Sequence, residues 1–322
     1  MNSRNYKKTP YNEPFIVRRA DPYIYRHRDG SCYFTASVPE YDRIILRRSE
    51  TILGLRKAKE VTVWEKHPKG IMSTHIWAPE LHYINDRWYI YFAAGDVDDI
   101  WAIRPYVLEC KEPDPMTGTF KELGMMQSSD DYSFQDFSLD MTVFEHGGNW
   151  YCIWAEKVSV GKKISNLYIA RLETPWKLST EQVTLSSPDY DWERAGFWVN
   201  EGPAVLKHGN KIYVTYSASA TGTCYCVGLQ SIDAGADLLD KNAWRKEREP
   251  VFKTDAEKGI FGPGHNCFVK SEDGLKDIMV YHARPYDEIT GDPLYDPNRH
   301  TYLMNIEWNS SGPFFNVKNN IG

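Results

Sequence analysis

The chain has 322 residues, of which 42% are hydrophobic, 25% charged and 14% aromatic, and it carries a formal net charge of −6. The apolar content is sufficient for a large core, which excludes a mainly disordered chain. No long block of Lys or Arg is present, so nucleic acid is not an expected partner. No apolar run approaches the ~18 residues needed to cross a bilayer, so a membrane is not an expected partner either.

The N-terminal stretch from Met1 to Tyr11 is polar and lacks the apolar segment of a secretory signal. We therefore expect a cytoplasmic protein, or a secreted one from which a leader peptide has been removed. The six cysteines are scattered without a C-x-x-C pair, and several lie in apolar, strand-like runs. They predict buried free thiols rather than a disulfide framework or a zinc site.

Five segments share one pattern: a polar residue, a short apolar run, a turn, and an aromatic-rich run that ends in small residues. The polar residues that open them are separated by 59, 60, 61 and 64 residues: Asp21, Glu80, Asp140, Glu201 and His265. Each segment predicts a β-hairpin, because its turn contains the Gly, Asn or Asp residues that adopt positive φ. These turns are Asp29-Gly30, Asn85-Asp86, Gly147-Gly148, Gly209-Asn210 and Asp273-Gly274.

A further β-like run follows every hairpin, and a fourth short run, such as residues 61–64 or 182–185, completes the repeat. About four strands in each of five repeats predict an all-β fold, a five-bladed β-propeller. We expect residues 1–322 to form one such domain. No long stretch has a helical period, which excludes an alternating β-α-β architecture.

The five opening residues predict a single functional site. The innermost strands of all blades begin at the same mouth of the central channel, so we expect residues at equivalent repeat positions to converge there. Four of them are carboxylic acids, whose mutual repulsion a substrate or a cation would offset. Facing carboxyl groups beside aromatic rings suit glycoside hydrolysis, in which one carboxylate activates water and a protonated partner donates to the leaving oxygen.

These motifs resemble glycoside hydrolase family 43, whose members are five-bladed propellers that act on arabinose- and xylose-containing polysaccharides. The resemblance extends from residues 20–22 to residues 296–300. It implies that Asp21 in Arg-Ala-Asp-Pro is the general base and that Glu201 in Asn-Glu-Gly-Pro is the general acid. It implies that Asp140 in Ser-Leu-Asp-Met orients the acid and raises its pKa. With Asp21 as a base, the sugar is released with inverted configuration.

The resemblance also implies binding roles. Trp77 in Ile-Trp-Ala-Pro resembles a wall of the sugar subsite, with packing between blades as the alternative. Arg284 in Tyr-His-Ala-Arg resembles an arginine that reaches the sugar hydroxyls, with a surface ion pair as the alternative. His265 resembles a channel histidine that holds a structural ion, calcium or another, through waters, or that only forms hydrogen bonds. We expect Glu80 to form hydrogen bonds in the channel, and no cofactor to take part in the chemistry.

Within the family, residues 134–140, 217–222 and 291–300 look most like the exo-acting α-L-arabinofuranosidases. The expected partner is therefore arabinan or another arabinose-containing oligo- or polysaccharide, from which terminal residues are released. A β-xylosidase or an endo-arabinanase of the same family stays open. A propeller that binds glycans without cleaving them also stays open, although it would be expected to repeat its binding residues in several blades.

Overall fold

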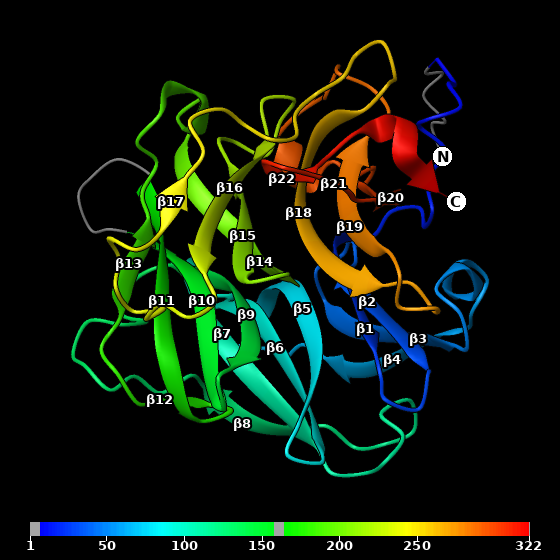
Figure 1. Cartoon of the computed structure of the whole chain (residues 1–322). Helices are drawn as coiled ribbons and strands as arrows, with labels where there is room; N and C mark the ends of the chain where they lie inside the picture. The colour runs from blue at the N-terminus through cyan, green and yellow to red at the C-terminus, as the bar shows by residue number, and fades with distance from the viewer. Residues whose placement is uncertain (1–6, 158–163, 322) are drawn as a thin grey trace.

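The computed structural model describes residues 7–157 and 164–321, and almost all of its regular elements are β-strands. The strands form five blades arranged around a central axis, so the fold is the predicted five-bladed β-propeller (Figure 1). Within the described ranges, no helix is long and apolar enough to span a bilayer.

Each blade is built from antiparallel strands. Blade I contains β1 (Ala20–Arg26), β2 (Cys32–Ser37), β3 (Arg43–Ser49) and β4 (Glu60–Glu65). Blade II contains β5 (Thr74–Ile84), β6 (Arg87–Asp96), β7 (Asp99–Cys110) and β8 (Lys121–Met125). Blade III contains β9 (Ser138–His146), β10 (Asn149–Lys157), β11 (Ile164–Thr174), β12 (Lys177–Leu178) and β13 (Val183–Ser186).

The second half of the chain forms the other two blades. Blade IV contains β14 (Trp198–His208), β15 (Lys211–Ala218), β16 (Cys226–Asp233) and β17 (Arg245–Lys246). Blade V contains β18 (Phe261–Lys270), β19 (Asp277–Arg284), β20 (His300–Asn305) and β23 (Asn320–Ile321), beside a hairpin of β21 (Glu307–Asn309) and β22 (Gly312–Phe314). Short 3-10 helices lie in the connections: η1 (Leu53–Arg56), η2 (Asp191–Glu193), η3 (Pro293–Tyr295) and η4 (Val317–Asn319).

The predicted turns join the two innermost strands of each blade. The turn residues with positive φ are Gly30, Asn85, Asp86, Gly147, Gly148, Gly209 and Gly274. Glycine and asparagine adopt this conformation at low cost, so the local sequence fixes where each innermost hairpin reverses. The hairpin predictions are confirmed in all five blades.

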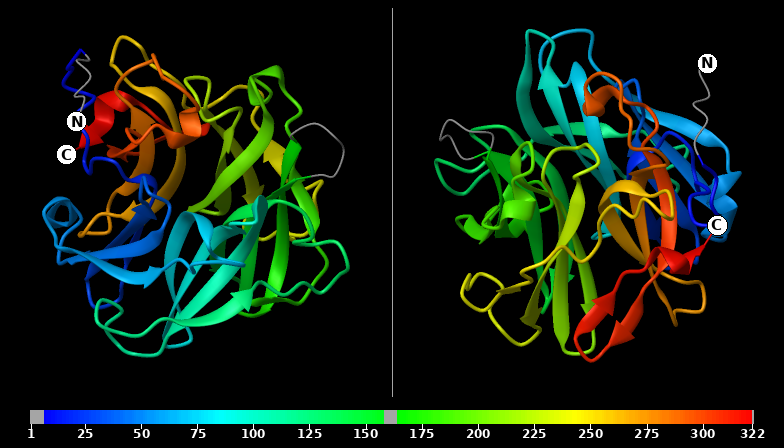
Figure 2. Two further views of the ribbon diagram at one scale, coloured as in Figure 1. Left: turned by 180° about the vertical axis from the view of Figure 1, so that it is seen from behind. Right: turned by 90° about the horizontal axis from the view of Figure 1, so that it is seen from above.

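Contacts between neighbouring blades close the ring, which Figure 2 shows from behind and from above. The N–H of Thr301 in β20 donates to the carbonyl of Ile16 at 2.9 Å, and the N–H of Phe15 donates to the Thr301 carbonyl at 2.8 Å. The segment that precedes blade I is therefore bound to blade V. Blades III and IV are joined by a parallel pairing of β11 with β14, at Ser165 and Val199.

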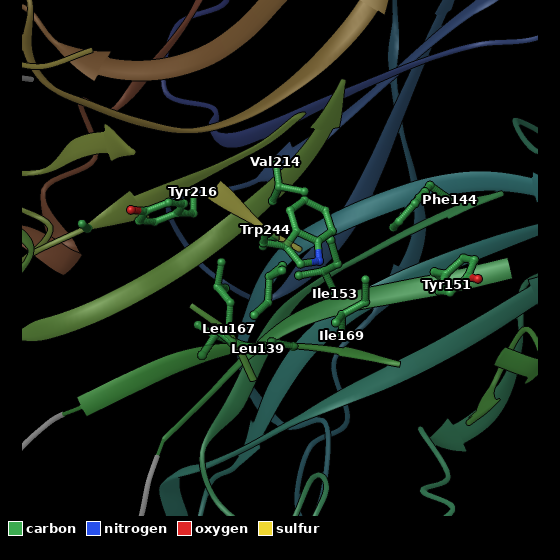
Figure 3. Close-up of a cluster of buried hydrophobic side chains, with 14 of the residues drawn as sticks. Leu139, Phe144, Tyr151, Ile153, Leu167, Ile169, Val214, Tyr216 and Trp244 are labelled. Atoms are coloured by element: carbon green, nitrogen blue, oxygen red, sulfur yellow. The ribbon is translucent and has the colours of Figure 1, made fainter. Parts of the chain in front are cut away.

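Apolar side chains fill the space between the blades. In the cluster of Figure 3, Leu139 and Ile153 of blade III pack with Val214 and Tyr216 of blade IV, next to Trp244. Full burial of each large apolar side chain contributes about 1.5–3 kcal/mol to stability. Because both faces of a blade are covered by its neighbours, inner strands such as β2 are buried along their whole length.

The cysteines follow the same pattern with one exception. All six are free thiols. Five are buried, as predicted: Cys32, Cys110, Cys152, Cys226 and Cys267. Cys224 is exposed, because it lies in the loop before β16 rather than in a strand.

Candidate active site

A β-bulge interrupts the innermost strand of every blade, and the strand pairing shifts register there. In each blade a residue at a bulge has positive φ: Asp21, Ala78, Asp140, Gly202 and His265. The innermost strands of blades II and V contain a second bulge, with positive φ at His75 and Gly262. Aspartate and histidine are among the side chains that tolerate this conformation best after glycine. A bulge breaks the in-and-out alternation of a strand and re-aims the local side chain, which here turns it toward the channel mouth.

The bulges also show that the five opening residues do not occupy equivalent positions in their blades. The expectation of equivalent positions is therefore wrong. Asp21, Asp140 and His265 occupy the positive-φ position itself. Glu201 precedes that position by one residue, and Glu80 follows it by two. Repeat spacing alone could not reveal this offset. The offset changes the spacing by only one or two residues, and the length of the repeat already varies by that much.

The position directly before the bulge supplies the side walls of the site. It is occupied by Trp77 in blade II, Leu139 in blade III and Glu201 in blade IV, and all three side chains line the same cavity.

The cavity at the channel mouth has a volume of about 430 Å³ and is lined by residues from all five blades. It brings together five of the predicted residues: Asp21, Trp77, Asp140, Glu201 and His265. The other lining residues are Trp101, Phe137, Leu139, Lys157, Ser165, Phe197, Val199, Ser219, Thr221, Tyr225, Asp292, Leu294 and Arg299. Arg284 and Glu80 are not part of the lining.

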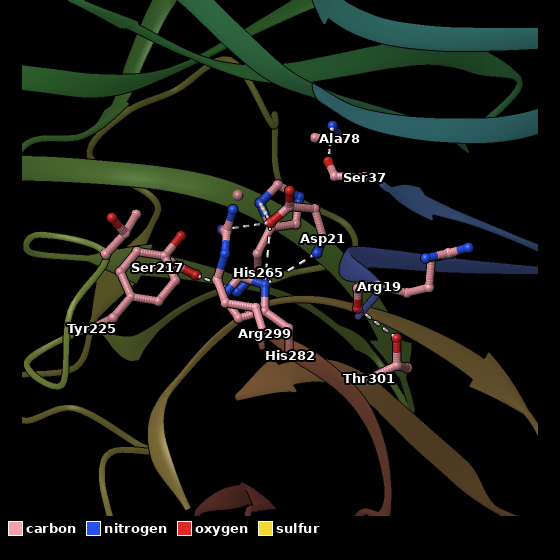
Figure 4. Close-up of polar contacts among 12 residues, drawn as sticks. Arg19, Asp21, Ser37, Ala78, Ser217, Tyr225, His265, His282, Arg299 and Thr301 are labelled. Carbon is pink, nitrogen blue, oxygen red and sulfur yellow. Dashed lines mark hydrogen bonds and ion pairs between the residues drawn. The ribbon is translucent and has the colours of Figure 1, made fainter. Parts of the chain in front are cut away.

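Asp21 is a buried carboxylate that faces basic groups (Figure 4). Its Oδ1 lies 3.1 Å from Nδ1 of His282, 3.4 Å from Nη1 of Arg299 and 3.6 Å from Nδ1 of His265. Burial acts to raise the pKa of Asp21, but the charge of Arg299 and the neighbouring imidazoles outweigh burial and hold this pKa well below its ordinary value. Asp21 is therefore ionised at neutral pH.

Glu201, which is half-buried, and Asp140, which is buried, are carboxyl groups from adjoining blades. The Tyr225 hydroxyl donates to Oε1 of Glu201 at 2.8 Å, and the Gly202 N–H donates to Oδ2 of Asp140 at 3.0 Å. Burial raises the pKa of Glu201 to about 7, with help from the charge of Asp21 and against the Tyr225 hydrogen bond. Burial and the charge of Glu201 raise the pKa of Asp140 well above its ordinary value. The two groups titrate as an interacting pair that retains a proton near neutral pH.

Trp77 packs in the protein and also lines the cavity, and its role as a wall of the sugar subsite stays a prediction. Its ring stacks on His75, with centroids 4.3 Å apart and an interplanar angle of 27°. The rings of Tyr41 and Trp77 pack edge to face, with their centroids 5.7 Å apart. Two further rings that line the cavity are much more exposed, Trp101 at 49% and Phe197 at 39%. The cavity therefore has a fixed aromatic wall and an exposed aromatic rim.

The sequence of this propeller matches the model of a known enzyme family. The family model described as "Glycosyl hydrolases family 43" matches residues 11–314. The chain belongs to glycosyl hydrolase family 43. The match spans all five blades, so the family assignment covers every strand that lines the cavity.

Two relatives are nearly half identical to this chain over the aligned residues. The extracellular exo-α-(1→5)-L-arabinofuranosidase of Streptomyces avermitilis is 49% identical over 308 residues, which cover 95% of this chain and 63% of that protein. The chain thus spans less than two thirds of that relative. The protein of the same description from Streptomyces chartreusis is 49% identical over 287 residues, covering 89% of this chain and 86% of that protein.

Solved structures show the same fold. The crystal structure of an α-L-arabinofuranosidase from Lactobacillus brevis has a TM-score of 0.89 at 49% identity, and the match covers 94% of this chain and 95% of that chain. A thermostable family-43 glycoside hydrolase shares the fold at 22% identity, with a TM-score of 0.75 over 96% of this chain and 95% of that chain.

In this family 43 propeller, Arg284 lies beside the cavity rather than in its lining. Its Nη1 donates to the carbonyl of Thr221 at 2.8 Å and its Nη2 to the carbonyl of Pro293 at 2.6 Å. The side chain is 1% exposed, so Arg284 ties together two loops that border the cavity. Arg299, which sequence reasoning passed over, is the arginine that lines the cavity.

Arg299 had only a weak signal in the sequence. It lies in the stretch 296–300, which carried the family resemblance but occupies no repeat position. Its Nη2 donates to the Tyr41 hydroxyl at 2.7 Å while its Nη1 faces Asp21. His282 was missed for a similar reason, because it lies on β19, the second strand of blade V, and not on the strand that opens the blade.

Glu80 forms the hydrogen bond expected of it, outside the cavity. Nε2 of His82 donates to Oε2 of Glu80 at 2.8 Å, and both side chains are buried. The negative charge of Glu80 also contributes to raising the pKa of Asp140, after burial, Glu201 and Asp21.

The residues around His265 do not fit an ion that the protein ligates directly. Nδ1 of His265 lies 3.6 Å from an oxygen of Asp21 and 3.6 Å from an oxygen of Asp140. Across residues 7–157 and 164–321, no group of three or more His, Cys, Asp or Glu side chains is arranged to hold a metal ion. Calcium prefers about six to eight oxygen ligands, which this donor set does not supply. An ion held through waters stays a prediction.

Proposed function

We propose that the chain is an exo-acting α-L-arabinofuranosidase that releases terminal α-L-arabinofuranosyl residues from arabinan or arabinose-containing oligosaccharides, with inversion of configuration. One observation carries the proposal: an ionised carboxylate and a carboxyl pair that retains a proton face one cavity. Glycoside hydrolysis requires this difference in protonation between two acids. The choice of arabinose is supported by the exo-α-(1→5)-L-arabinofuranosidase relatives.

Glu201 is the proposed general acid. Its pKa of about 7 lets it hold a proton at the pH at which it must donate to the leaving oxygen. Asp140 is proposed to maintain that pKa and to orient the acid. It acts through its charge and through the N–H of Gly202, the residue that follows Glu201 in the chain.

Asp21 is the proposed general base. It is ionised because Arg299 faces it, so it can accept a proton from a water molecule that attacks the anomeric carbon. A single displacement inverts the anomeric configuration and needs about 6.5–9.5 Å between the two carboxyl groups to leave room for that water. Blades I and IV are not neighbours in the ring, which supports such a separation.

Trp77 is proposed to stack on the terminal sugar, and Arg299 to replace Arg284 as the arginine that reaches its hydroxyls. Both line the cavity, whereas the guanidinium of Arg284 is bound to two carbonyl groups. The cavity volume of about 430 Å³ lies toward the lower end of the ~300–1,000 Å³ usual for ligand sites. That size supports exo action on one terminal residue over accommodation of a long chain.

The proposed location is extracellular. The Streptomyces avermitilis and Streptomyces chartreusis relatives are both described as extracellular, which does not support the cytoplasmic expectation. An arabinan polysaccharide is also too large to reach an enzyme that stays inside the cell.

Product analysis tests the proposal. The enzyme is incubated with nitrophenyl α-L-arabinofuranoside, nitrophenyl β-D-xylopyranoside, linear arabino-oligosaccharides and arabinan, and the products are separated by chromatography. We expect arabinose from the arabinofuranoside and stepwise shortening of the oligosaccharides by one residue. Release of xylose alone would indicate a β-xylosidase, and internal cleavage an endo-arabinanase. Saturable binding of oligosaccharide without any product would indicate a glycan-binding propeller.

A further inference from the structure

Two stacked rings lie between the carboxyl groups assigned to the acid and the base. The rings of Tyr225 and His282 are nearly parallel, with an interplanar angle of 7° and centroids 5.7 Å apart (Figure 4). Both side chains are buried, Tyr225 at 2% exposure and His282 at 1%. Each ring binds a different carboxyl-bearing residue, so the stack connects blade I with blade IV.

His282 holds Asp21. Its Nδ1 lies 3.1 Å from the backbone nitrogen of Asp21 and 3.1 Å from Oδ1 of the same residue. Either tautomer of the neutral ring therefore bonds to Asp21, by accepting from its N–H or by donating to its carboxylate. Asp21 has a φ of 51°, a conformation that persists only when its surroundings hold it. His282 supplies such a contact directly at the strained residue.

The second ring nitrogen of His282 indicates that the contact with Asp21 is the specific one. Nε2 of His282 has no hydrogen-bond partner among the protein groups of residues 7–157 and 164–321. Its ring thus makes its protein hydrogen bond to Asp21 alone, which favours a role at Asp21 over a general role in packing.

Tyr225 holds Glu201 through its hydroxyl, at 2.8 Å from Oε1. The ring lies against β18 at Gly264, the residue paired with His282 across β18 and β19. A Cβ at Gly264 would lie 2.2 Å from Cε1 of Tyr225. Only glycine at this position lets the Tyr225 ring approach the strand pair and stack on His282.

We propose that Tyr225 and His282 are a positioning pair that sets where Asp21 stands relative to Glu201. This inference rests on the proposed function and deepens it. The separation of the two carboxyl groups distinguishes a single displacement, at about 6.5–9.5 Å, from a double displacement, at about 5–5.5 Å. A rigid stack with one end on each residue fixes that separation. His282 lies outside the cavity lining, so it acts through Asp21 and not on the sugar.

Four variants separate the contacts of the pair. His282→Phe keeps a ring for the stack and removes Nδ1, and Tyr225→Phe keeps the stack and removes the hydroxyl. His282→Asn places an amide near the position of Nδ1, whereas His282→Gln carries its amide past that position. His300→Phe is the matched control, because Nδ1 of buried His300 accepts the N–H of Arg18 at 3.0 Å, and Arg18 also has positive φ.

We expect His282→Phe to lower kcat about 100-fold, the cost of a misplaced reacting group, with KM changed less than about threefold. The loss should be equal on substrates with good and poor leaving groups, because the base acts on both. His282→Asn should recover part of the loss and His282→Gln should not. Tyr225→Phe should lose more kcat on substrates with poor leaving groups than on those with good ones. The factor by which kcat falls in the double Phe variant should be smaller than the product of the factors for the two single variants. His300→Phe should keep kcat while its Tm falls.

Several results would overturn the proposal that Tyr225 and His282 position Asp21 relative to Glu201. They are an unchanged kcat in His282→Phe, equal kcat in the Asn and Gln variants, or strictly multiplicative losses in the double variant. If His282→Phe does not fold, the comparison of Asn with Gln and the leaving-group pattern of Tyr225→Phe decide the question. Failure of the proposed function is a separate outcome, because wild-type protein would then release no arabinose.

Discussion

Replacing Asp140 with Asn removes a carboxyl group that shares a proton with the proposed acid, and it keeps an oxygen that can accept the Gly202 N–H. A charge within hydrogen-bonding or near-contact range shifts the pKa of a carboxyl group by roughly one to three units, and one unit corresponds to about 1.4 kcal/mol. The pKa of Glu201 should therefore fall from its value of about 7. Glu201 must be protonated to donate, so activity is lost as pH rises through this pKa. The alkaline limb of the profile should move to lower pH by about one to two units.

The assay is kcat/KM for nitrophenyl α-L-arabinofuranoside between about pH 4 and pH 9, since this ratio reports the groups of the free enzyme. The control is Asp131→Asn, a change at an exposed carboxylate, which should leave the limb in place. An unmoved limb in Asp140→Asn would refute the reasoning, because it would mean that Asp140 is neutral in the wild type. A limb moved to higher pH would contradict the sign of the interaction.

Three further variants test other contacts. Glu201→Ala should lose ~10²–10⁴ in kcat on substrates with poor leaving groups and much less on dinitrophenyl glycosides, which need no protonation; equal losses would reject the acid role. Arg284→Ala should lower Tm by several degrees, because two charge-assisted hydrogen bonds are lost, while KM changes little. A large rise in KM at unchanged Tm would instead place Arg284 on the sugar. His265→Ala should lower kcat roughly tenfold or more with a smaller effect on Tm, and a chelator should reduce wild-type activity only if an exchangeable ion is held there.

The blades could be predicted from the sequence because their signals are local. The turn at Gly147-Gly148 and the buried run of β10 lie within one hairpin, and a repeat of about 60 residues multiplies that signal five times. The same repeat located Asp21 and Asp140. Their chemistry could be anticipated because carboxyl groups are rarely clustered without a partner or a function.

The offset of Glu201 could not be predicted, because a bulge depends on pairing between strands and leaves no spacing that one sequence displays. Arg284 and Arg299 could not be distinguished either. Which of the two lines the cavity depends on where the carbonyls of Thr221 and Pro293 lie after folding. His282 is recognisable only once β18 and β19 are paired and Tyr225 lies across them.

The stereochemistry of hydrolysis tests the central claim most directly. Proton NMR is recorded on nitrophenyl α-L-arabinofuranoside with enough enzyme that the first-formed anomer appears before mutarotation. With Asp21 as base and Glu201 as acid in a single displacement, the first product is β-L-arabinofuranose. First-formed α-L-arabinofuranose, or a covalent glycosyl adduct on Asp21, would contradict both the role of Asp21 and the separation that the two carboxyl groups are proposed to keep.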